Sequence, residues 1–208
     1  MNKILIITIL LGSFILNSCH KRLDNLSFKN KFELITEDNI FKDPDYYNWG
    51  SSIIKGDDGK YHLFYSWWAE DFSAWLTFSE IAHAISDSPL GPWLYSETVL
   101  KGRGKGHWDA ITAHNPKIKY FEGKYYLYYI ATNLGDEKYT DQDLIATHGK
   151  SLTQSSVRKA LRENQRTGVA VSHSINGPWS RMNKPIIEPS GPISTLTVNP
   201  ATSNEKTI

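Results

Sequence analysis

Short apolar and aromatic runs, each bounded by a turn signal, recur along this chain. One run, GKYHLFY at 59–65, follows Asp57 and Asp58, and a second run, GKYYLYY at 123–129, follows Glu122. An apolar segment precedes each run, so segment, tight turn and returning segment together predict a β-hairpin. The spacing from Gly59 to Gly123 recurs in other parts of the two copies. Similarity at a fixed spacing predicts a repeat architecture.

Each copy has a second part with the same order of elements. Residues 81–85 and 168–172 predict a third strand, and the tripeptide GPW at 91–93 and 177–179 predicts a turn after it. Short apolar segments at 99–100 and 185–187 predict a fourth strand. Three or four short antiparallel strands in each repeat are typical of a propeller blade. The two Trp residues of the GPW turns are expected to pack inside their blades.

The second copy contains an insertion. The stretch from Gly123 to Trp179 is much longer than the corresponding stretch from Gly59 to Trp93, and the extra residues fall within 133–166. Residues 152–164 have helical character. A functional loop and a polar surface excursion both remain open for this stretch.

A third copy begins with VNPAT at 198–202, but no hairpin follows before residue 208. The pattern therefore predicts an all-β chain with about two propeller blades and the start of a third. Because propellers have at least about four blades, we expect the chain to be the N-terminal portion of a longer protein.

The N-terminus predicts export. Lys3 precedes an apolar run at 4–16, and LNSC at 16–19 resembles a bacterial lipobox. We expect residues 1–18 to be a signal peptide, Cys19 to be lipidated, 19–44 to be a leader, and 45–208 to be a partial propeller. The protein would then be a periplasmic or outer-membrane lipoprotein of a Gram-negative bacterium. An ordinary signal peptide with an incidental Cys is the alternative.

Charge and composition narrow the possible partners. The 23 basic and 22 acidic residues give a net charge of +1 without a basic stripe, so we expect no nucleic-acid partner. Aromatic residues make up 12% of the chain, including 7 Trp and 11 Tyr. Flat rings can stack on the C–H face of a sugar, although aromatic residues also fill the cores of β-sheets.

The hairpin GKYYLYY, the element VAVS…GPW at 169–179, and the segments WD…HNP at 108–116 and NQRTG at 164–168 together resemble the five-bladed β-propeller glycoside hydrolases of families 43, 32, 62, 68 and 117. The resemblance covers about residues 45–202 and is strongest to family 43. It implies an exo-acting glycoside hydrolase for a plant or algal oligo- or polysaccharide. A truncated propeller that only binds carbohydrate and a sugar transferase are the alternatives.

Two acids are candidates for glycoside hydrolysis. Asp45 and Asp109 have the same spacing along the chain as Gly59 and Gly123, which suggests equivalent places on adjacent blades. Hydrolysis needs one carboxylic acid to protonate the leaving oxygen and a second carboxylate as base or nucleophile. We interpret Asp45 as the base and Asp109 as a carboxylate that orients substrate or tunes a neighbour. Turn capping by either Asp is the alternative.

The sequence also departs from the family 43 pattern. Where that family has its two Asp residues, this sequence reads WGS at 49–51 and PKI at 116–118. The family's catalytic Glu would lie beyond residue 208. In the third copy, the position that corresponds to Asp45 and Asp109 is occupied by Ile193. His114 is therefore a candidate general acid, since His titrates near neutral pH. A structural hydrogen bond is the other interpretation of His114.

Further residues are candidates for substrate binding. Arg166 could pair with an acidic sugar or form a surface salt bridge. The Trp residues could stack on a sugar ring or fill the core. We expect no cofactor and no metal site, although calcium is possible because some relatives hold it in the channel. The expected substrate-binding residues are Trp49, Trp67, Trp108, Asn115, Arg166 and Asn199.

Overall fold

The computed structural model describes residues 34–69 and 71–189. The signal peptide, the lipidation site Cys19 and the third-copy residues Ile193 and Asn199 lie outside the described residues, so the expectations for them stay predictions. The chain divides into two units after Glu37, and both sheets belong to the second unit.

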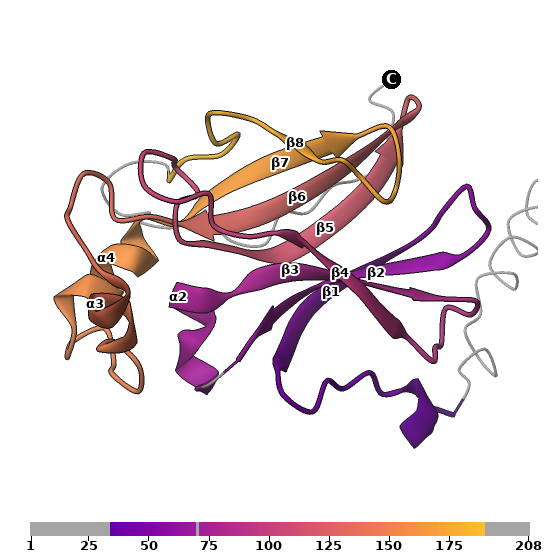
Figure 1. Ribbon diagram of the computed structural model, residues 1–208, viewed down its shortest axis with the longest axis horizontal. Helices are drawn as coiled ribbons and strands as arrows, with labels where there is room; N and C mark the ends of the chain where they lie inside the picture. Colours follow the sequence, from indigo (N-terminus) through magenta and orange to yellow (C-terminus); the bar gives the residue numbers. More distant parts are fainter. Residues whose placement is uncertain (1–33, 70, 190–208) are drawn as a thin grey trace, which may run out of the picture. The chain divides into compact units, whose positions relative to one another are not determined.

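The described chain forms two four-stranded sheets, with strand orders β1-β2-β3-β4 and β5-β6-β7-β8 (Figure 1). Every neighbouring pair is antiparallel, so each sheet is a meander of consecutive strands, as in a propeller blade. The predicted all-β class and the two blades are confirmed. The strands are β1 (Tyr47–Lys55), β2 (Tyr61–Trp68), β3 (Glu80–Ser86), β4 (Leu94–Leu100), β5 (Thr112–Phe121), β6 (Lys124–Thr132), β7 (Arg166–Ser172) and β8 (Ser180–Arg181).

The outer strand of the second blade differs from the prediction. The sequence predicts it at 185–187, but β8 is at Ser180–Arg181, directly after the GPW turn. Of the predicted segment, Ile187 makes only an isolated bridge to Thr167. Pro185 has no backbone N–H, so this segment cannot donate a continuous ladder to β7.

The first strands of the two blades carry matching bulges. The register of β1 shifts between Trp49 and Ser52, and that of β5 shifts between His114 and Lys117. The spacing between the two bulges is thus one residue longer than the spacing from Gly59 to Gly123. The reason is that the hairpin turn of the first blade has one residue more than that of the second. Asp109 therefore matches residue 44, and the predicted equivalence of Asp45 and Asp109 does not hold.

The two sheets share one hydrophobic core. Residues from the middle of both blades are almost fully buried together, and Trp179 packs against them, while Trp93 packs against a second cluster within the first blade. Both GPW turns thus place their Trp in blade packing, as predicted. The shared core consists of Phe64, Ile81, Leu100, Ala113, Ile118, Tyr125, Leu127, Tyr129, Ala131, Ala170 and Ile175.

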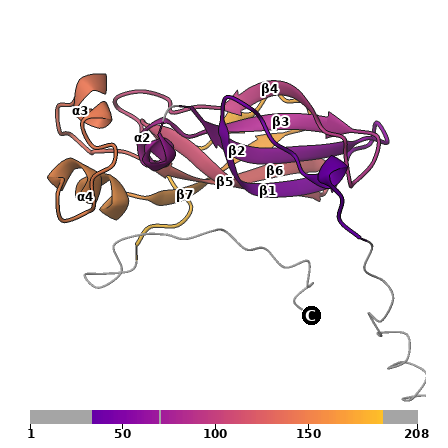
Figure 2. The ribbon, with the colours of Figure 1, turned by 90° about the horizontal axis from the view of Figure 1, so that it is seen from below.

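The helices α2 (Trp75–Phe78), α3 (Asp141–Ile145) and α4 (Ser156–Glu163) gather at one end of the sheets, in both views of the ribbon (Figures 1 and 2). The helix predicted in the insertion is confirmed as α4, Ser156–Glu163. A cluster of four buried leucines, Leu76, Leu134, Leu144 and Leu161, joins it to α2 and α3. The insertion therefore packs against α2, which follows the second strand of the first blade, and is not a detached excursion. The shorter helices are η1 (Glu37–Asn39), η2 (Phe72–Ala74), α2 (Trp75–Phe78) and α3 (Asp141–Ile145).

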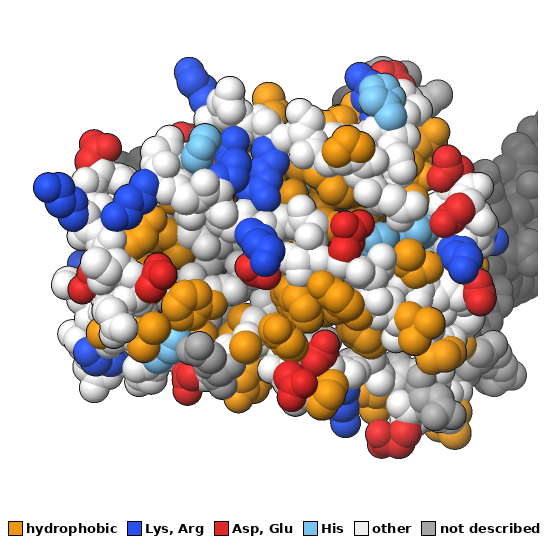
Figure 3. All heavy atoms as spheres, viewed as in Figure 1, with side chains coloured by type: hydrophobic (Ala, Val, Ile, Leu, Met, Phe, Trp, Pro, Cys, Tyr) orange, Lys and Arg blue, Asp and Glu red, His pale blue; other side chains and the backbone are white. Residues whose placement is uncertain are grey.

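Charges are mixed on the face seen in Figure 3, where basic and acidic side chains are interspersed without a continuous stripe of one sign. Within the part of the chain that the structure describes, no helix is long and apolar enough to cross a membrane.

A histidine pair is buried in the first blade. The His62 Nδ1 and His83 Nε2 atoms lie 2.8 Å apart, and Asp58 contacts the other ring nitrogen of His62 at 3.1 Å. The His83 ring stacks on Phe64 with centroids 4.5 Å apart. Burial first, and His62 second, lower the pKa of His83 to about 4. His83 is therefore neutral in the folded protein.

We expect the folded protein to lose stability on acidification partly through His83. The unfolded chain binds a proton below the ordinary His pKa of 6.5, whereas folded His83 does not until pH 4. The contribution of His83 to the free energy of unfolding is fully present above pH 6.5 and is lost as the pH falls toward 4. Between pH 7 and pH 5 this loss is about 2 kcal/mol. Urea unfolding across this range should show a shallower pH dependence for His83→Phe.

The control variant is His173→Gln, because His173 is exposed. It should retain the wild-type pH dependence. An unchanged pH dependence in His83→Phe would contradict the assignment, whatever that variant's stability at neutral pH.

Candidate functional site

A pocket of about 390 Å³ lies where the first strands of both blades meet the helices. Three residues predicted from the sequence, Trp49, His114 and Asn115, come together in it. Its walls combine four aromatic rings with polar side chains. The lining residues are Trp49, Ser66, Trp68, Phe72, Trp75, Ser79, His114, Asn115, Ile130, Arg162 and Gln165.

The two bulges shape this pocket. Gly50 in β1 and Asn115 in β5 both have left-handed backbone, with φ of 56° and 50°. Asn115 donates its backbone N–H to Ser66 Oγ at 2.7 Å. A Cβ on Gly50 would lie 2.7 Å from the Asn115 side-chain oxygen, so only Gly gives the Asn115 amide this space. The bulges thus re-aim the first strands at the pocket.

A buried polar chain forms one side of the pocket. Arg162 Nη1 donates to Gln165 Oε1 at 2.9 Å, and Gln165 Nε2 lies 3.2 Å from His114 Nε2. Because the Gln165 oxygen accepts from Arg162, its amide nitrogen is left to donate to an unprotonated His114 Nε2. Only 1% of Gln165 and 3% of His114 is exposed.

This environment argues against His114 as the general acid. Burial first, and the Arg162 charge second, lower the pKa of His114 to about 3, while its hydrogen bond to Asn115 acts in the opposite direction. At neutral pH the ring carries no acidic proton to give to a leaving group. The alternative interpretation, a structural hydrogen bond at the strand entry, fits the geometry.

The aromatic walls come from the first blade and from the short helices η2 and α2 that follow its second strand. The Arg162 guanidinium carbon lies 5.4 Å from the Trp75 ring centroid, a cation–π arrangement, and Trp75 meets His114 edge to face at 5.5 Å. Trp49 and Phe72 expose 59% and 58% of their surface, so their rings are open to solvent.

Sequence reasoning misses much of this lining. Phe72, Trp75 and Arg162 do not stand out in the sequence as site residues, and Gln165 is marked only as part of the segment NQRTG at 164–168. The insertion contacts His114 only through tertiary packing, and a local sequence pattern does not predict such a contact.

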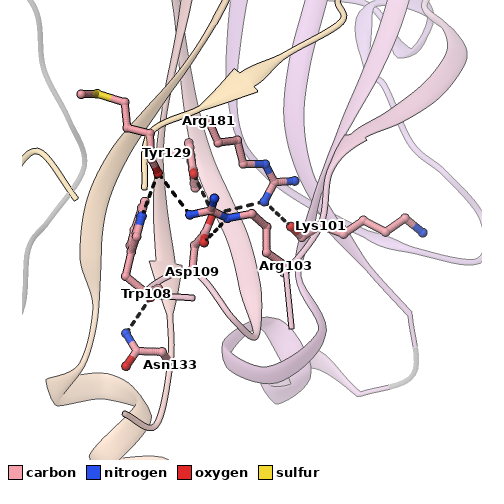
Figure 4. A network of polar contacts seen from close by, with 8 residues as sticks. Lys101, Arg103, Trp108, Asp109, Tyr129, Asn133 and Arg181 are labelled. Atoms are coloured by element: carbon pink, nitrogen blue, oxygen red, sulfur yellow. Dashed lines mark hydrogen bonds and ion pairs between the residues drawn. The ribbon is translucent and has the colours of Figure 1, made fainter. Parts of the chain in front are cut away.

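Asp109 lies outside the pocket, in the buried network of Figure 4. Its carboxylate is fully buried and accepts from Arg103 Nε at 2.6 Å, Arg181 Nη1 at 3.2 Å and Tyr129 Oη at 2.8 Å. Burial first, and the Asp109 charge second, raise the pKa of Tyr129, so its phenol stays protonated and donates. With two arginines balancing it, Asp109 fits a structural role and not the predicted site role.

Asp45 also lies outside the pocket. It is exposed in a turn, where its backbone N–H donates to Asp43 Oδ1 at 3.1 Å. Asp43 is thus the residue that caps the turn. The structure brings Asp45 neither to Asp109 nor to the pocket lining, so the proposed carboxylate pair is not assembled by these two residues.

Three further candidates make other contacts. Trp67 is buried and stacks on Tyr46 at 4.1 Å. Trp108 stacks on Tyr129 at 5.5 Å. Arg166 Nε pairs with an oxygen of Glu188 at 2.6 Å, which agrees with the alternative of a surface salt bridge. None of the three candidates lines the pocket. Among residues 34–69 and 71–189, no group of three His, Cys, Asp or Glu is placed to hold a metal ion.

No family model and no curated protein matches the chain. Among solved structures, a family 117 glycoside hydrolase from the marine bacterium Zobellia galactanivorans matches at 20% identity and TM-score 0.48, over 72% of this chain and 40% of that one. A thermostable family-43 glycoside hydrolase matches at 17% and 0.49, over 79% and 46%. The GH43_1 enzyme from Xanthomonas citri complexed with xylotriose matches at 19% and 0.45, over 71% and 34%.

This chain thus spans less than half the length of each of these solved proteins. The likeness concerns the fold alone, and no sugar, reaction or residue role is transferred from it.

We expect Asp109→Asn to unfold the protein more easily. Removing one partner of a buried ion pair leaves the arginines uncompensated, which costs about 3–5 kcal/mol. Urea or thermal unfolding followed by circular dichroism measures this loss. Asp87→Asn is the matched control, because the Asp87 side chain is 91% exposed and pairs with Lys60 at 3.8 Å. Wild-type stability in Asp109→Asn would contradict the structural role.

Proposed function

We propose that the pocket binds a sugar, and that the protein is a glycoside hydrolase of the propeller type to which this portion contributes substrate binding. The observation that carries the proposal is the pairing of open aromatic rings with a buried polar side in one pocket. Trp49 and Phe72 provide apolar faces, whereas Gln165 and His114 provide hydrogen-bonding groups. A sugar ring needs both kinds of surface.

An unsatisfied hydroxyl supports a polar ligand. Ser79 lines the pocket and is 1% exposed, and its Oγ has no hydrogen-bond partner among the described residues. A buried hydroxyl without a partner is costly, so a ligand hydroxyl that bonds to it would gain affinity. The pocket volume of about 390 Å³ also lies in the usual range for small-ligand sites.

The hydrolytic part of the proposal depends on the sequence motifs of the propeller hydrolases. We infer the cleavage of a glycosidic bond at the end of a plant or algal oligo- or polysaccharide. No Asp or Glu of the described residues lines the pocket. The two carboxyl groups that hydrolysis needs would therefore come from outside the described residues.

The missing carboxylates favour a second candidate, a propeller that binds carbohydrate without cleaving it. The two candidates share the pocket and differ only in whether the bound sugar is hydrolysed.

We also propose export and lipid anchoring through Cys19, with the pocket in the periplasm or at the outer membrane. The lipobox-like LNSC at 16–19 supports this location. The basic residues after Cys19 favour the periplasmic side of the inner membrane.

Binding should depend on the exposed pocket tryptophan. Calorimetry of the full chain with xylotriose, arabinotriose, cellotriose and trigalacturonate should detect at least one ligand, and Trp49→Ala should weaken that binding roughly tenfold through lost ring stacking. Phe121→Ala is the control, since Phe121 is equally exposed at 59% but does not line the pocket. No binding by the folded protein, or equal losses in both variants, would refute the proposed site.

Hydrolysis separates the two candidates. Reducing-end release from the same sugars would support the hydrolase, and binding without release would support the non-hydrolysing alternative.

Lipidation has its own test. In a Gram-negative host, the wild-type chain should incorporate labelled palmitate and sediment with membranes, whereas Cys19→Ser should do neither. An unlabelled wild-type chain, cleaved elsewhere, would instead indicate an ordinary signal peptide.

A further inference from the structure

We infer that the pocket selects a sugar with an anionic substituent, a carboxylate or a sulfate ester, through Arg162. The inference rests on the proposed function, because it specifies which carbohydrate the pocket binds. Three observations carry it: the contacts of Arg162, the charge of the pocket lining, and the position of Arg162 beside the open aromatic rings.

The contacts of Arg162 leave its charge uncompensated. Its guanidinium donates to the neutral Gln165 amide at 2.9 Å and lies over the Trp75 ring. No salt bridge to Arg162 occurs among residues 34–69 and 71–189, whereas Arg103, Arg181 and Arg166 each pair with a carboxylate there. Arg162 is thus a half-buried cation without a counter-ion in the described chain.

The rest of the pocket does not supply that counter-ion. Its lining contains one arginine and no acid among the described residues, and His114 is neutral. The Arg162 charge is also one cause of the lowered pKa of His114. Arg158, on the same helix, does not line the pocket; its side chain donates to the Ser73 carbonyl, and Asp71 acts on its charge. The lining is therefore electropositive, and an anionic ligand would balance it.

Geometry favours an anion with two oxygens. The described hydrogen bond uses Nη1 of Arg162, which leaves Nε and Nη2 for a ligand. A guanidinium binds a carboxylate or sulfate through two parallel N–H donors. The Trp75 ring and the Gln165 amide hold the group in place, so little side-chain freedom is lost when a ligand binds.

This assignment differs from the sequence prediction, in which Arg166 contacts an acidic sugar. Arg166 is paired with Glu188 at 2.6 Å and does not line the pocket. We therefore assign the contact with the acidic sugar to Arg162 on α4, and not to Arg166 at the start of β7.

The test compares three sugars that differ only at C6. Calorimetry of the full chain would use the methyl glycosides of galacturonic acid, galactose 6-sulfate and galactose. We expect at least one anionic sugar to bind about tenfold more tightly than galactose, and added salt to reduce that difference. Preference for the acid over the sulfate, or the reverse, identifies the source of the anion.

Variants link the preference to Arg162. Arg162→Gln should abolish the preference, so that the variant binds the anionic sugar no more tightly than it binds methyl galactoside. Lys159→Gln is the matched control, because it removes the same charge from α4 at a side chain that is 61% exposed and contacts Glu163 at 3.7 Å. It should leave the preference intact. Thermal unfolding of each variant confirms folding.

The possible failures are distinct. Equal binding of all three sugars would overturn the anionic inference and leave the sugar-binding proposal standing. A preference that survives in Arg162→Gln would overturn the role of Arg162. Binding of a neutral oligosaccharide such as xylotriose, with no binding of any of the three C6 probes, would also overturn the inference. No binding of any sugar by the folded protein would refute the proposed function itself.

Discussion

The arrangement of the two blades depends on one buried charge. Asp109 joins three parts of the chain, because Arg103 comes from the connection between the blades, Tyr129 from β6 and Arg181 from β8 (Figure 4). Arg181 also donates to the Lys101 carbonyl at 2.6 Å, which attaches the end of the first blade to the outer strand of the second. A carboxylate without exposure is tolerated only with such complete pairing.

The geometry of the pocket depends on this Asp109 network between the blades. Strand β5 begins at Thr112, shortly after Asp109, and carries His114 and Asn115 into the pocket. The helical insertion between β6 and β7 supplies Arg162 and Gln165, which lie near its C-terminal end. The blade junction and the pocket are thus connected by β5. A substitution at Asp109 that displaces this strand would also displace His114 and Asn115 in the pocket.

Local patterns predict the elements but not their long-range partners. The hairpins, the all-β class and α4 follow from turn residues and periodicity, which act over a few positions. The role of Asp109 depends on Arg181, far along the chain, and that of Arg162 depends on Gln165 and His114, so neither can be read from spacing. The comparison of Asp45 with Asp109 is wrong because one extra turn residue shifts the first strands by one position.

That extra residue has a consequence for the exchange of blades. Side chains alternate between the faces of a strand, so a one-residue slip turns every side chain to the opposite face. A chimera that combined β1 with the shorter hairpin turn of the second blade would move Trp49 from the pocket side to the other face of its sheet. The two repeats are therefore not interchangeable modules, and recombination between them would need to carry each strand together with its own turn.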